Sequence, residues 1–345
     1  MSATRSVAGL LVVGLLATGC ASSEARSKGI DGVLRLGVFP TLTHAPAHVA
    51  VADGILDRAL GSTRLEVTTF ESGTDAGVAL LSGAIDATYI GPWPAVSLFL
   101  RSGRIAVVSG VAAGGASLVV RADAGIDGPE DLHDRRIAVP GVSNTQDIAL
   151  RTWLHDNGLL ARDEGGDVSI VGLAGSGVLA LFEHDRIDGA WVPEPYPSQL
   201  LEEGVGERLV DEAELWPPGE LLSASLVVST AYLDEHPDVV RALVAANVEA
   251  IRLCIEEPDR AKALARERLA ELGGLELDDT VLDDAWSRLT FTWDPLATSF
   301  ARVADHAYGV GLLDEPPGDL SGMYRLDALN GVLNDVSLPP VEVAA

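Results

Sequence analysis

The segments IDATYIGPWP (residues 85–94) and IDGAWVPEPYP (residues 187–197) repeat one pattern within a chain of 345 residues. Each copy begins with Ile-Asp, continues through small residues to an aromatic and a β-branched residue, and ends in a proline-rich turn that holds a second aromatic. A short apolar run of this kind predicts a buried strand. The prolines end the strand because proline has no N–H to donate to a neighbouring strand. The repeat therefore predicts two related strand-and-turn units.

The repeat extends upstream of both segments. Strand-like runs occupy 33–40 and 135–141, and a second pair of such runs occupies 64–73 and 167–177. In both copies a helical pattern separates the strands. Strands that alternate with helices through short connections predict a parallel sheet covered by helices. Two such blocks predict an α/β protein with two pseudo-symmetric lobes.

Two further strand-like runs mark where the chain passes between the lobes. They are ASLVV at 116–120 and SASLVV at 223–228, and helical patterns fill most of the chain after the second. We expect these two strands to form a hinge, with the lobes facing each other across a cleft. Lobe one is expected to hold 33–115 and 226–345, including the C-terminal helices, and lobe two to hold 116–225.

The composition is that of a folded protein with an acidic surface. Hydrophobic residues make up 47% of the chain and charged residues 22%. The chain has 51 Asp and Glu residues against 24 Lys and Arg residues, which gives a formal net charge of −27 at pH 7. Because such a surface repels the phosphates of nucleic acids, we expect no nucleic-acid partner.

The N-terminus has the pattern of a cleaved export signal. Arg5 precedes an apolar run at 7–17, and small residues then lead to Cys20. The run is too short to span a bilayer, so we interpret 1–19 as a signal peptide. Cys20 after Ala-Thr-Gly resembles the lipobox of bacterial lipoproteins. This resemblance implies a lipid anchor on the Cys20 sulfur, with the polar segment 20–32 as a tether. The alternative is an ordinary secretory signal with an incidental cysteine.

Five segments, in order along the chain, resemble the nitrate/sulfonate/taurine-type (NitT/TauT-type) substrate-binding proteins of ABC importers. The segments are LRLGVFPTLTHAPAHVAVADGIL (34–56), SGAIDATYIGPWPA (82–95), GGASLVV (114–120), GVSNTQDIALRTWL (141–154) and RIDGAWVPEPY (186–196). The resemblance covers nearly all of 33–335. It implies a type II periplasmic-binding-protein fold whose two lobes close on a small ligand.

The same resemblance implies partners and a location. A protein of this family delivers its ligand to an ABC permease that a separate ATPase drives. With a lipid on Cys20, the protein is expected at the extracytoplasmic face of the cell membrane, or in the periplasm, as a monomer. The family carries nitrate, sulfonates, taurine, bicarbonate and thiamine-precursor pyrimidines, so the resemblance leaves the ligand open.

Uncharged polar side chains fill the loops that follow the predicted strands, where ligands of parallel α/β sheets bind. The hydroxyl and amide side chains in these loops are Thr41, Thr43, Ser72, Ser143, Asn144, Thr145 and Gln146. The loops hold no Lys or Arg, and most lead into helix N-termini, whose free N–H groups suit an anion. We therefore predict that N–H and O–H donors bind a monoanion such as a sulfonate. His44 would add positive charge if it were protonated.

The two proline-rich turns add aromatic and acidic candidates. Trp93 and Tyr196 are held between prolines, and we predict that these rigid rings pack on the ligand. Glu194 lies between Pro193 and Pro195 and has two interpretations. It accepts a hydrogen bond from an amine or ring N–H of the ligand, or it caps a local backbone N–H. The first interpretation favours a zwitterion such as taurine, or an aminopyrimidine, over a simple oxyanion.

The sequence shows no constellation that would support catalysis. It contains no G-x-S-x-G motif, no His/Cys ligand cluster and no P-loop. We therefore expect a binding protein without catalytic residues, cofactor or metal. The alternatives are a receptor for a thiamine-precursor pyrimidine or another heteroaromatic, a pyrimidine-synthesis-like enzyme on the same scaffold, and a sensor lipoprotein that has lost transport.

Overall fold

The first sheet contains six strands in the order β11-β4-β10-β3-β1-β2. Their bounds are β1 Val33–Val38, β2 Arg64–Thr69, β3 Ala87–Ile90, β4 Ile105–Gly114, β10 Leu222–Ser229 and β11 Leu289–Phe291. β1 runs parallel to β2 and β3, whereas β10 runs antiparallel to β3 and β4. Every residue of β3 and β4 is buried, because helices cover both faces of this sheet.

The second sheet repeats this arrangement with five strands in the order β7-β6-β8-β5-β9. Their bounds are β5 Ala116–Arg121, β6 Arg136–Val139, β7 Ser169–Gly172, β8 Gly189–Pro193 and β9 Gly206–Asp211. β6 runs parallel to β7 and β8, and β5 runs antiparallel to β8 and β9. The two repeated sequence segments form β3 and β8, each next to the first strand of its block. The two α/β lobes predicted from the repeat are therefore present.

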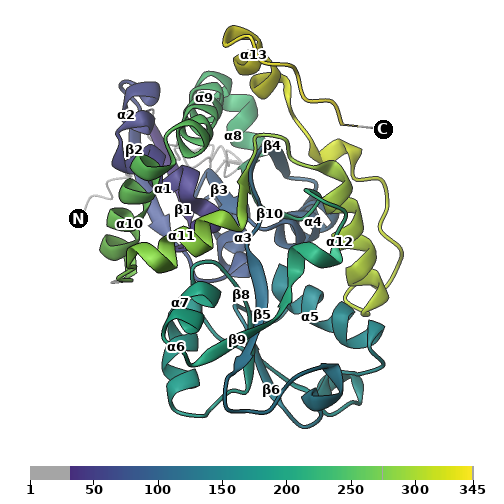
Figure 1. Cartoon of the computed structure of the whole chain (residues 1–345). Helices are drawn as coiled ribbons and strands as arrows, with labels where there is room; N and C mark the ends of the chain where they lie inside the picture. Colours follow the sequence, from purple (N-terminus) through teal and green to yellow (C-terminus); the bar gives the residue numbers. More distant parts are fainter. Residues whose placement is uncertain (1–31, 274, 344–345) are drawn as a thin grey trace, which may run out of the picture. The chain divides into compact units, whose positions relative to one another are not determined.

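Helices and short 3-10 turns connect and cover the strands (Figure 1). The α-helices are α1 Ala45–Ala52, α2 Ile55–Leu60, α3 Gly73–Ser82, α4 Pro92–Ser102, α5 Thr145–Asp156, α6 Gly175–Glu183, α7 Tyr196–Glu202, α8 Thr230–Glu235, α9 Pro237–Glu256, α10 Pro258–Gly273, α11 Asp279–Ser287, α12 Ala297–Gly309 and α13 Asp327–Asp335. The 3-10 turns are η1 Leu42–His44, η2 Pro129–Leu132, η3 Arg162–Glu164, η4 Glu212–Leu215 and η5 Ser321–Met323. α9 packs against α1, α2, α10 and α13, so the C-terminal helices complete lobe one as expected.

The computed structural model describes residues 32–273 and 275–343. The predicted signal peptide, Cys20 and all but the last residue of the predicted tether lie outside the described residues. Within the described ranges, no helix combines the length and apolar character needed to cross a bilayer.

The chain passes between the lobes twice. β4 ends at Gly114 and β5 begins at Ala116, so the first crossing is at Gly115. The second crossing is the segment between β9 and β10, which contains η4. β10 pairs with β4 from its first residue, Leu222, so 222–225 belong to lobe one. The predicted lobe boundary at 225 fell inside this strand, because the partner that defines the strand's start is distant in sequence.

Candidate ligand-binding site

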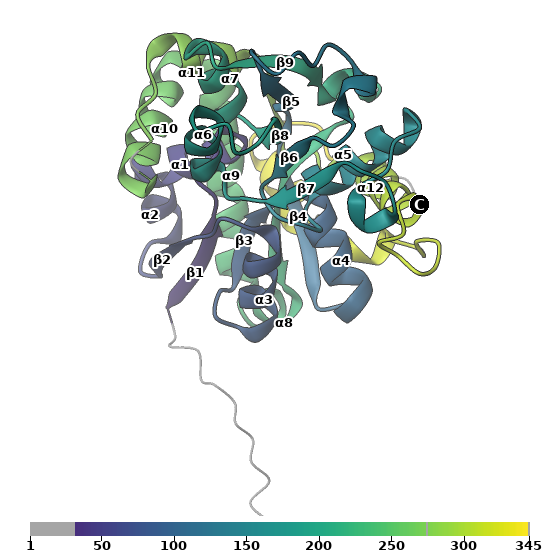
Figure 2. The ribbon, with the colours of Figure 1, turned by 90° about the horizontal axis from the view of Figure 1, so that it is seen from below.

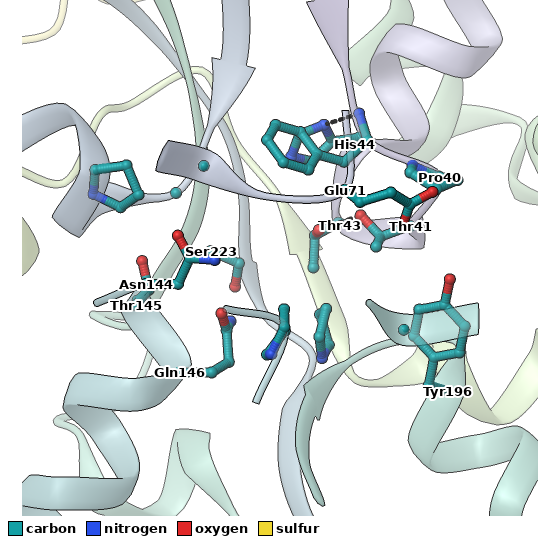
Figure 3. A pocket seen from close by; sticks show the side chains of 17 residues that line it. Pro40, Thr41, Thr43, His44, Glu71, Asn144, Thr145, Gln146, Tyr196 and Ser223 are labelled. Atoms are coloured by element: carbon teal, nitrogen blue, oxygen red, sulfur yellow. Dashed lines mark hydrogen bonds between the residues drawn. The ribbon is translucent and has the colours of Figure 1, made fainter. Parts of the chain in front are cut away.

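A cavity of about 70 Å³ lies between the lobes, at the carboxyl ends of the parallel strands (Figure 3). Lobe one lines it with Phe39, Pro40, Thr41, Thr43, His44, Glu71, Gly73, Gly91, Pro94 and Ser223. Lobe two lines it with Pro140, Asn144, Thr145, Gln146, Gly175, Pro193 and Tyr196. Seven of the eleven residues predicted from the sequence are therefore together in one cavity.

The N-termini of several helices meet at this cavity. Lining residues belong to the starts of α1, α3, α4, α5 and α6. The fold places them there because each parallel strand ends in a short loop that leads directly into the next helix. The first amides of a helix lack intrahelical acceptors, and the helix dipole is positive at this end. The arrangement favours a negatively charged ligand group without requiring a cationic side chain.

The lining has no cationic side chain. Among residues 32–273 and 275–343, no Lys or Arg lines the cavity, and Glu71 is the charged residue that does. Partial burial raises the pKa of the Glu71 carboxyl above its ordinary value. In Figure 3, Glu71, Thr41 and Tyr196 lie at one end of the cavity. Asn144, Thr145, Gln146 and Ser223 lie at the other end. The cavity is therefore polarised, with a carboxylate at one end and neutral donors at the other.

His44 is a neutral donor rather than a cation. The backbone N–H of Phe39 donates to His44 Nδ1 at 3.1 Å, so the proton of the neutral ring is on Nε2. Burial lowers the pKa of His44 well below its ordinary value, and the nearby His48 lowers it further. Burial therefore disfavours the positive charge considered for His44, because an imidazolium there would lose its solvation.

Asn144 is the N-cap residue of α5, but its side chain makes no capping hydrogen bond. The Asp147 carboxylate binds this loop instead, because its Oδ2 accepts a hydrogen bond from the Ser143 N–H at 2.6 Å. Asn144 is 5% exposed, and its buried Oδ1 has no hydrogen-bond partner among the described residues. A buried amide oxygen without a partner is costly, so this side chain is suited to hydrogen-bond a ligand.

Tyr196, one of the two predicted aromatic residues, lines the cavity. Its ring is 3% exposed and packs on Gly175 at the start of α6, where any Cβ would overlap the ring. Burial raises the pKa of the Tyr196 hydroxyl above its ordinary value, and the Glu71 charge raises it further. The hydroxyl therefore stays protonated and remains a hydrogen-bond donor at the acidic end of the cavity.

Three predicted residues are beside the cavity but do not line it. The Ser72 side chain caps α3 by accepting from the Asp75 N–H at 3.3 Å. The Trp93 ring is buried in the core of lobe one, although its backbone N–H meets Thr145 Oγ1 at 3.4 Å across the cleft. Ser143 is exposed. The Ser72 and Trp93 side chains therefore stabilise lobe one, and none of the three side chains lines the cavity.

Glu194 does not line the cavity, and the second of its two interpretations holds, because its Oε2 accepts from the Ser198 backbone N–H at 3.2 Å. Its carboxylate is fully buried and accepts from Ser198 Oγ at 2.7 Å and from Arg208 Nη2 at 3.1 Å. Ser198 Oγ also contacts Asp284 Oδ2 of α11 at 2.7 Å. The backbone oxygen of Glu194 accepts from the Leu42 N–H of lobe one at 2.9 Å. Glu194 is therefore part of a contact between the lobes, and both carboxylate oxygens have protein partners.

Sequence reasoning did not select two of the polar lining residues. Glu71 was passed over because a carboxylate argues against an anion site, although it follows a strand end just as Ser72 does. Ser223 reaches the cavity because β10 pairs with β3 and β4. No local pattern around Ser223 shows that pairing.

Comparisons with known proteins give one family and one fold. The sequence model of the NMT1-like family matches residues 31–269. The taurine-binding periplasmic protein of Escherichia coli (strain K12) is 30% identical over 217 residues. That match covers 62% of this chain, and the chain spans 64% of that relative's length.

Two solved structures illustrate the fold. The alkanesulfonate-binding protein SsuA from Xanthomonas axonopodis pv. citri, bound to MOPS, has a TM-score of 0.72 at 19% identity and covers 86% of this chain and 98% of its own. The nitrate-binding protein NrtA from Synechocystis PCC 6803 has a TM-score of 0.75 at 17% identity and covers 89% of this chain and 90% of its own. These likenesses confirm the periplasmic-binding-protein fold that the sequence motifs implied.

Proposed function

The chain belongs to the NMT1-like family, and from that premise we propose that it is the substrate-binding protein of an ABC importer. Its ligand is a small aminoalkyl sulfonate, for which taurine is the model. The polarised cavity carries this proposal, since a carboxylate lies at one end and helix N-termini with neutral donors lie at the other.

The size of the cavity supports a ligand of this kind. A water-sized position takes on the order of 10–15 Å³. If each non-hydrogen atom of a ligand fills one such position, the cavity of about 70 Å³ accommodates roughly five to seven of these atoms. Taurine reaches the upper end of this range, whereas nitrate and bicarbonate fill only part of the space. A large sulfonate requires the lobes to separate further.

The charges support a zwitterion over a simple anion. A sulfonate near the start of α5 receives hydrogen bonds from helix amides and from the side chains of Thr145, Gln146 and Ser223. The ligand's ammonium group then lies toward Glu71, which is otherwise an acidic residue without compensation in an anion site. Thr41 and Tyr196 add hydroxyl groups at the same end.

The contacts between the lobes support binding by closure. The Leu42 N–H meets the Glu194 oxygen, and the Trp93 N–H meets the Thr145 hydroxyl, so backbone from lobe one touches lobe two on both sides of the cavity. A buried ligand enters only when these contacts open. Closure around the ligand then presents one defined surface to a permease, which an ATPase drives. The Cys20 lipid would hold the receptor at the extracytoplasmic face of the membrane.

Isothermal titration with taurine and propane-1-sulfonate tests the proposal. The second compound replaces the ammonium of taurine by a methyl group of similar size. We expect taurine to bind at least about tenfold more tightly, because a charge-assisted hydrogen bond is lost in the second compound. An aminopyrimidine and nitrate complete the panel. Tighter binding of the aminopyrimidine, or equal binding of the two sulfonates, contradicts the aminoalkyl-sulfonate proposal.

A further inference from the structure

A second cavity, of about 150 Å³, lies along α5, and Thr145 at the start of that helix lines both cavities. Residues from α5 of lobe two, η4 of the second crossing and α12 of lobe one line it. α5 and α12 lie side by side in both views and pack directly (Figures 1 and 2). This hinge cavity is therefore enclosed by both lobes and by the segment that joins them.

Glu212 gives the hinge cavity a buried negative group. It is 2% exposed, and its Oε2 accepts from Trp191 Nε1 at 2.6 Å. Its Oε1 makes no hydrogen bond to the described residues and is not one of the buried unsatisfied atoms, so it is open to the cavity. The lining includes His306 but no Arg or Lys of those residues. A carboxyl group this deeply buried is costly to ionise without a counter-ion, so the cavity is suited to a cation.

The other walls match an organic cation rather than a metal ion. Thr152 Oγ1 is buried without a hydrogen-bond partner among the described residues. Trp153 and Trp216 supply aromatic surface, and Trp216 already has the Arg302 guanidinium over its ring at 5.3 Å. Asp156 adds a second carboxylate at the wall. The acceptors of Glu212 and Thr152, together with two indoles, suit a group that is charged, donates N–H bonds and carries apolar carbon.

We propose that the hinge cavity is a second binding site, and that it takes a small secondary or primary organic ammonium. A cavity of about this volume holds a ring the size of benzene. The ammonium donates to Glu212 Oε1 and to the Thr152 hydroxyl, and its methylene groups pack on the indoles. The sulfonate group of the proposed interlobe ligand disfavours its binding here, because Glu212 and Asp156 repel that group.

Piperidinium is the probe for this site, because it is a six-membered ring whose cationic nitrogen carries two N–H donors. Tetrahydropyran is the matched neutral control, since it has the same ring size without charge or donor. The readout is the indole N–H signals of the full chain in nitrogen-15 NMR spectra. Trp191 donates to Glu212, so its indole signal reports directly on that carboxylate. We expect millimolar piperidinium to shift this signal in a saturable way and tetrahydropyran to leave it unchanged.

Two variants locate the site. Glu212→Gln keeps the shape and an acceptor for Trp191, and we expect it to weaken piperidinium binding at least about tenfold. Glu214→Gln removes an exposed carboxylate two residues away in η4, outside the cavity, and serves as the control. Taurine in excess must leave the piperidinium shift in place. No saturable shift, equal effects of the two variants, or displacement by taurine would each overturn the proposal.

Discussion

Glu71 is the charged side chain among the described lining residues, so in the proposed function its charge determines the preference for a zwitterion. Glu71→Gln keeps the shape of the side chain and removes the charge. We expect the affinity for taurine to fall about tenfold, because its ammonium group loses the carboxylate that it pairs with. Propane-1-sulfonate has no ammonium group, so we expect its affinity to stay unchanged. Titration calorimetry of both ligands measures this selectivity.

Asp75 provides the matched control for Glu71. It is an exposed carboxylate in the first turn of α3 and does not line the cavity. Asp75→Asn makes the same change in net charge nearby. An equal loss of taurine affinity in both variants would show that Glu71 acts through the general field and not through contact.

Glu212 links the hinge cavity to the pH dependence of stability. Burial raises the pKa of Glu212 to about 7, above its unfolded value, so the folded state binds this proton more tightly. The stability that this group contributes is present at low pH and is lost as pH rises through 7. We expect Glu212→Gln to stabilise the protein by up to about 3 kcal/mol near pH 8 and to have little effect near pH 5.

Urea unfolding of both proteins at the two pH values measures this difference. Glu194 also has its pKa raised to about 7 by burial, so the total pH dependence contains more than one group. Comparing the unchanged protein with Glu212→Gln isolates the contribution of Glu212 to this pH dependence. A variant that is less stable than the unchanged protein at both pH values would contradict the interpretation of Glu212 as an uncompensated charge.

The sequence located the binding loops better than it located the binding side chains. Thr41, Thr43 and Asn144 were found because strand ends meet at one edge of a parallel sheet, which is a property of topology. The choice between the two interpretations of Glu194 was not visible in the sequence, because its partner Arg208 is close only in the folded chain. Which way a side chain turns at a strand end depends on such partners, and one sequence does not show them.

At the level of elements, the first crossing depends on glycine. Gly115 has φ +72°, and a Cβ there would overlap the side chain of Leu289 in β11. We expect Gly115→Ala to destabilise the protein by about 2–4 kcal/mol, from backbone strain together with the overlap. Gly125 has φ +62° with open space around its Cβ position, so Gly125→Ala carries the strain alone, about 1 kcal/mol. If urea unfolding showed the same loss in the free energy of unfolding for Gly115→Ala and Gly125→Ala, the overlap would be contradicted.

Strands and helices were predictable because each has its own period of apolar residues. The repeated segments gave β3 and β8, and the helices after each loop were expected from their pattern. The second crossing was misplaced because β10 is defined by Leu222 pairing with Ala113, more than a hundred residues earlier. Pairing between strands that are distant in sequence determines where a strand such as β10 begins. The periodicity of apolar residues carries no information about that pairing.

At the level of the whole molecule, α11 holds the two lobes together. Asp284 of α11 contacts Ser198 at 2.7 Å and Arg208 at 3.5 Å, both in lobe two. Arg288, just after α11, pairs with Asp284 at 3.2 Å and with Asp211 of β9 at 2.9 Å. These partly exposed contacts favour the closed arrangement, together with the Leu42 N–H of lobe one, which donates to the backbone oxygen of Glu194.

Asp284→Asn weakens this contact without changing the interlobe cavity. We expect the dissociation constant of taurine to rise about threefold to tenfold, because the closed state becomes less populated before binding. We also expect a larger radius of gyration for the ligand-free variant in small-angle X-ray scattering. Asp283→Asn is the control, since Asp283 pairs with Lys262 on the lobe-one side. Unchanged taurine affinity in Asp284→Asn would show that α11 is passive in closure.

Thr145 lines both the interlobe cavity and the hinge cavity. Both cavities also take walls from both lobes, so an occupant of either one favours the same closed arrangement. By reciprocity, the factor by which an amine raises the affinity for taurine equals the factor by which taurine raises the affinity for the amine. The affinity of the receptor for the sulfonate would then depend on the concentration of the amine. The two compounds together would be bound more tightly than either one alone.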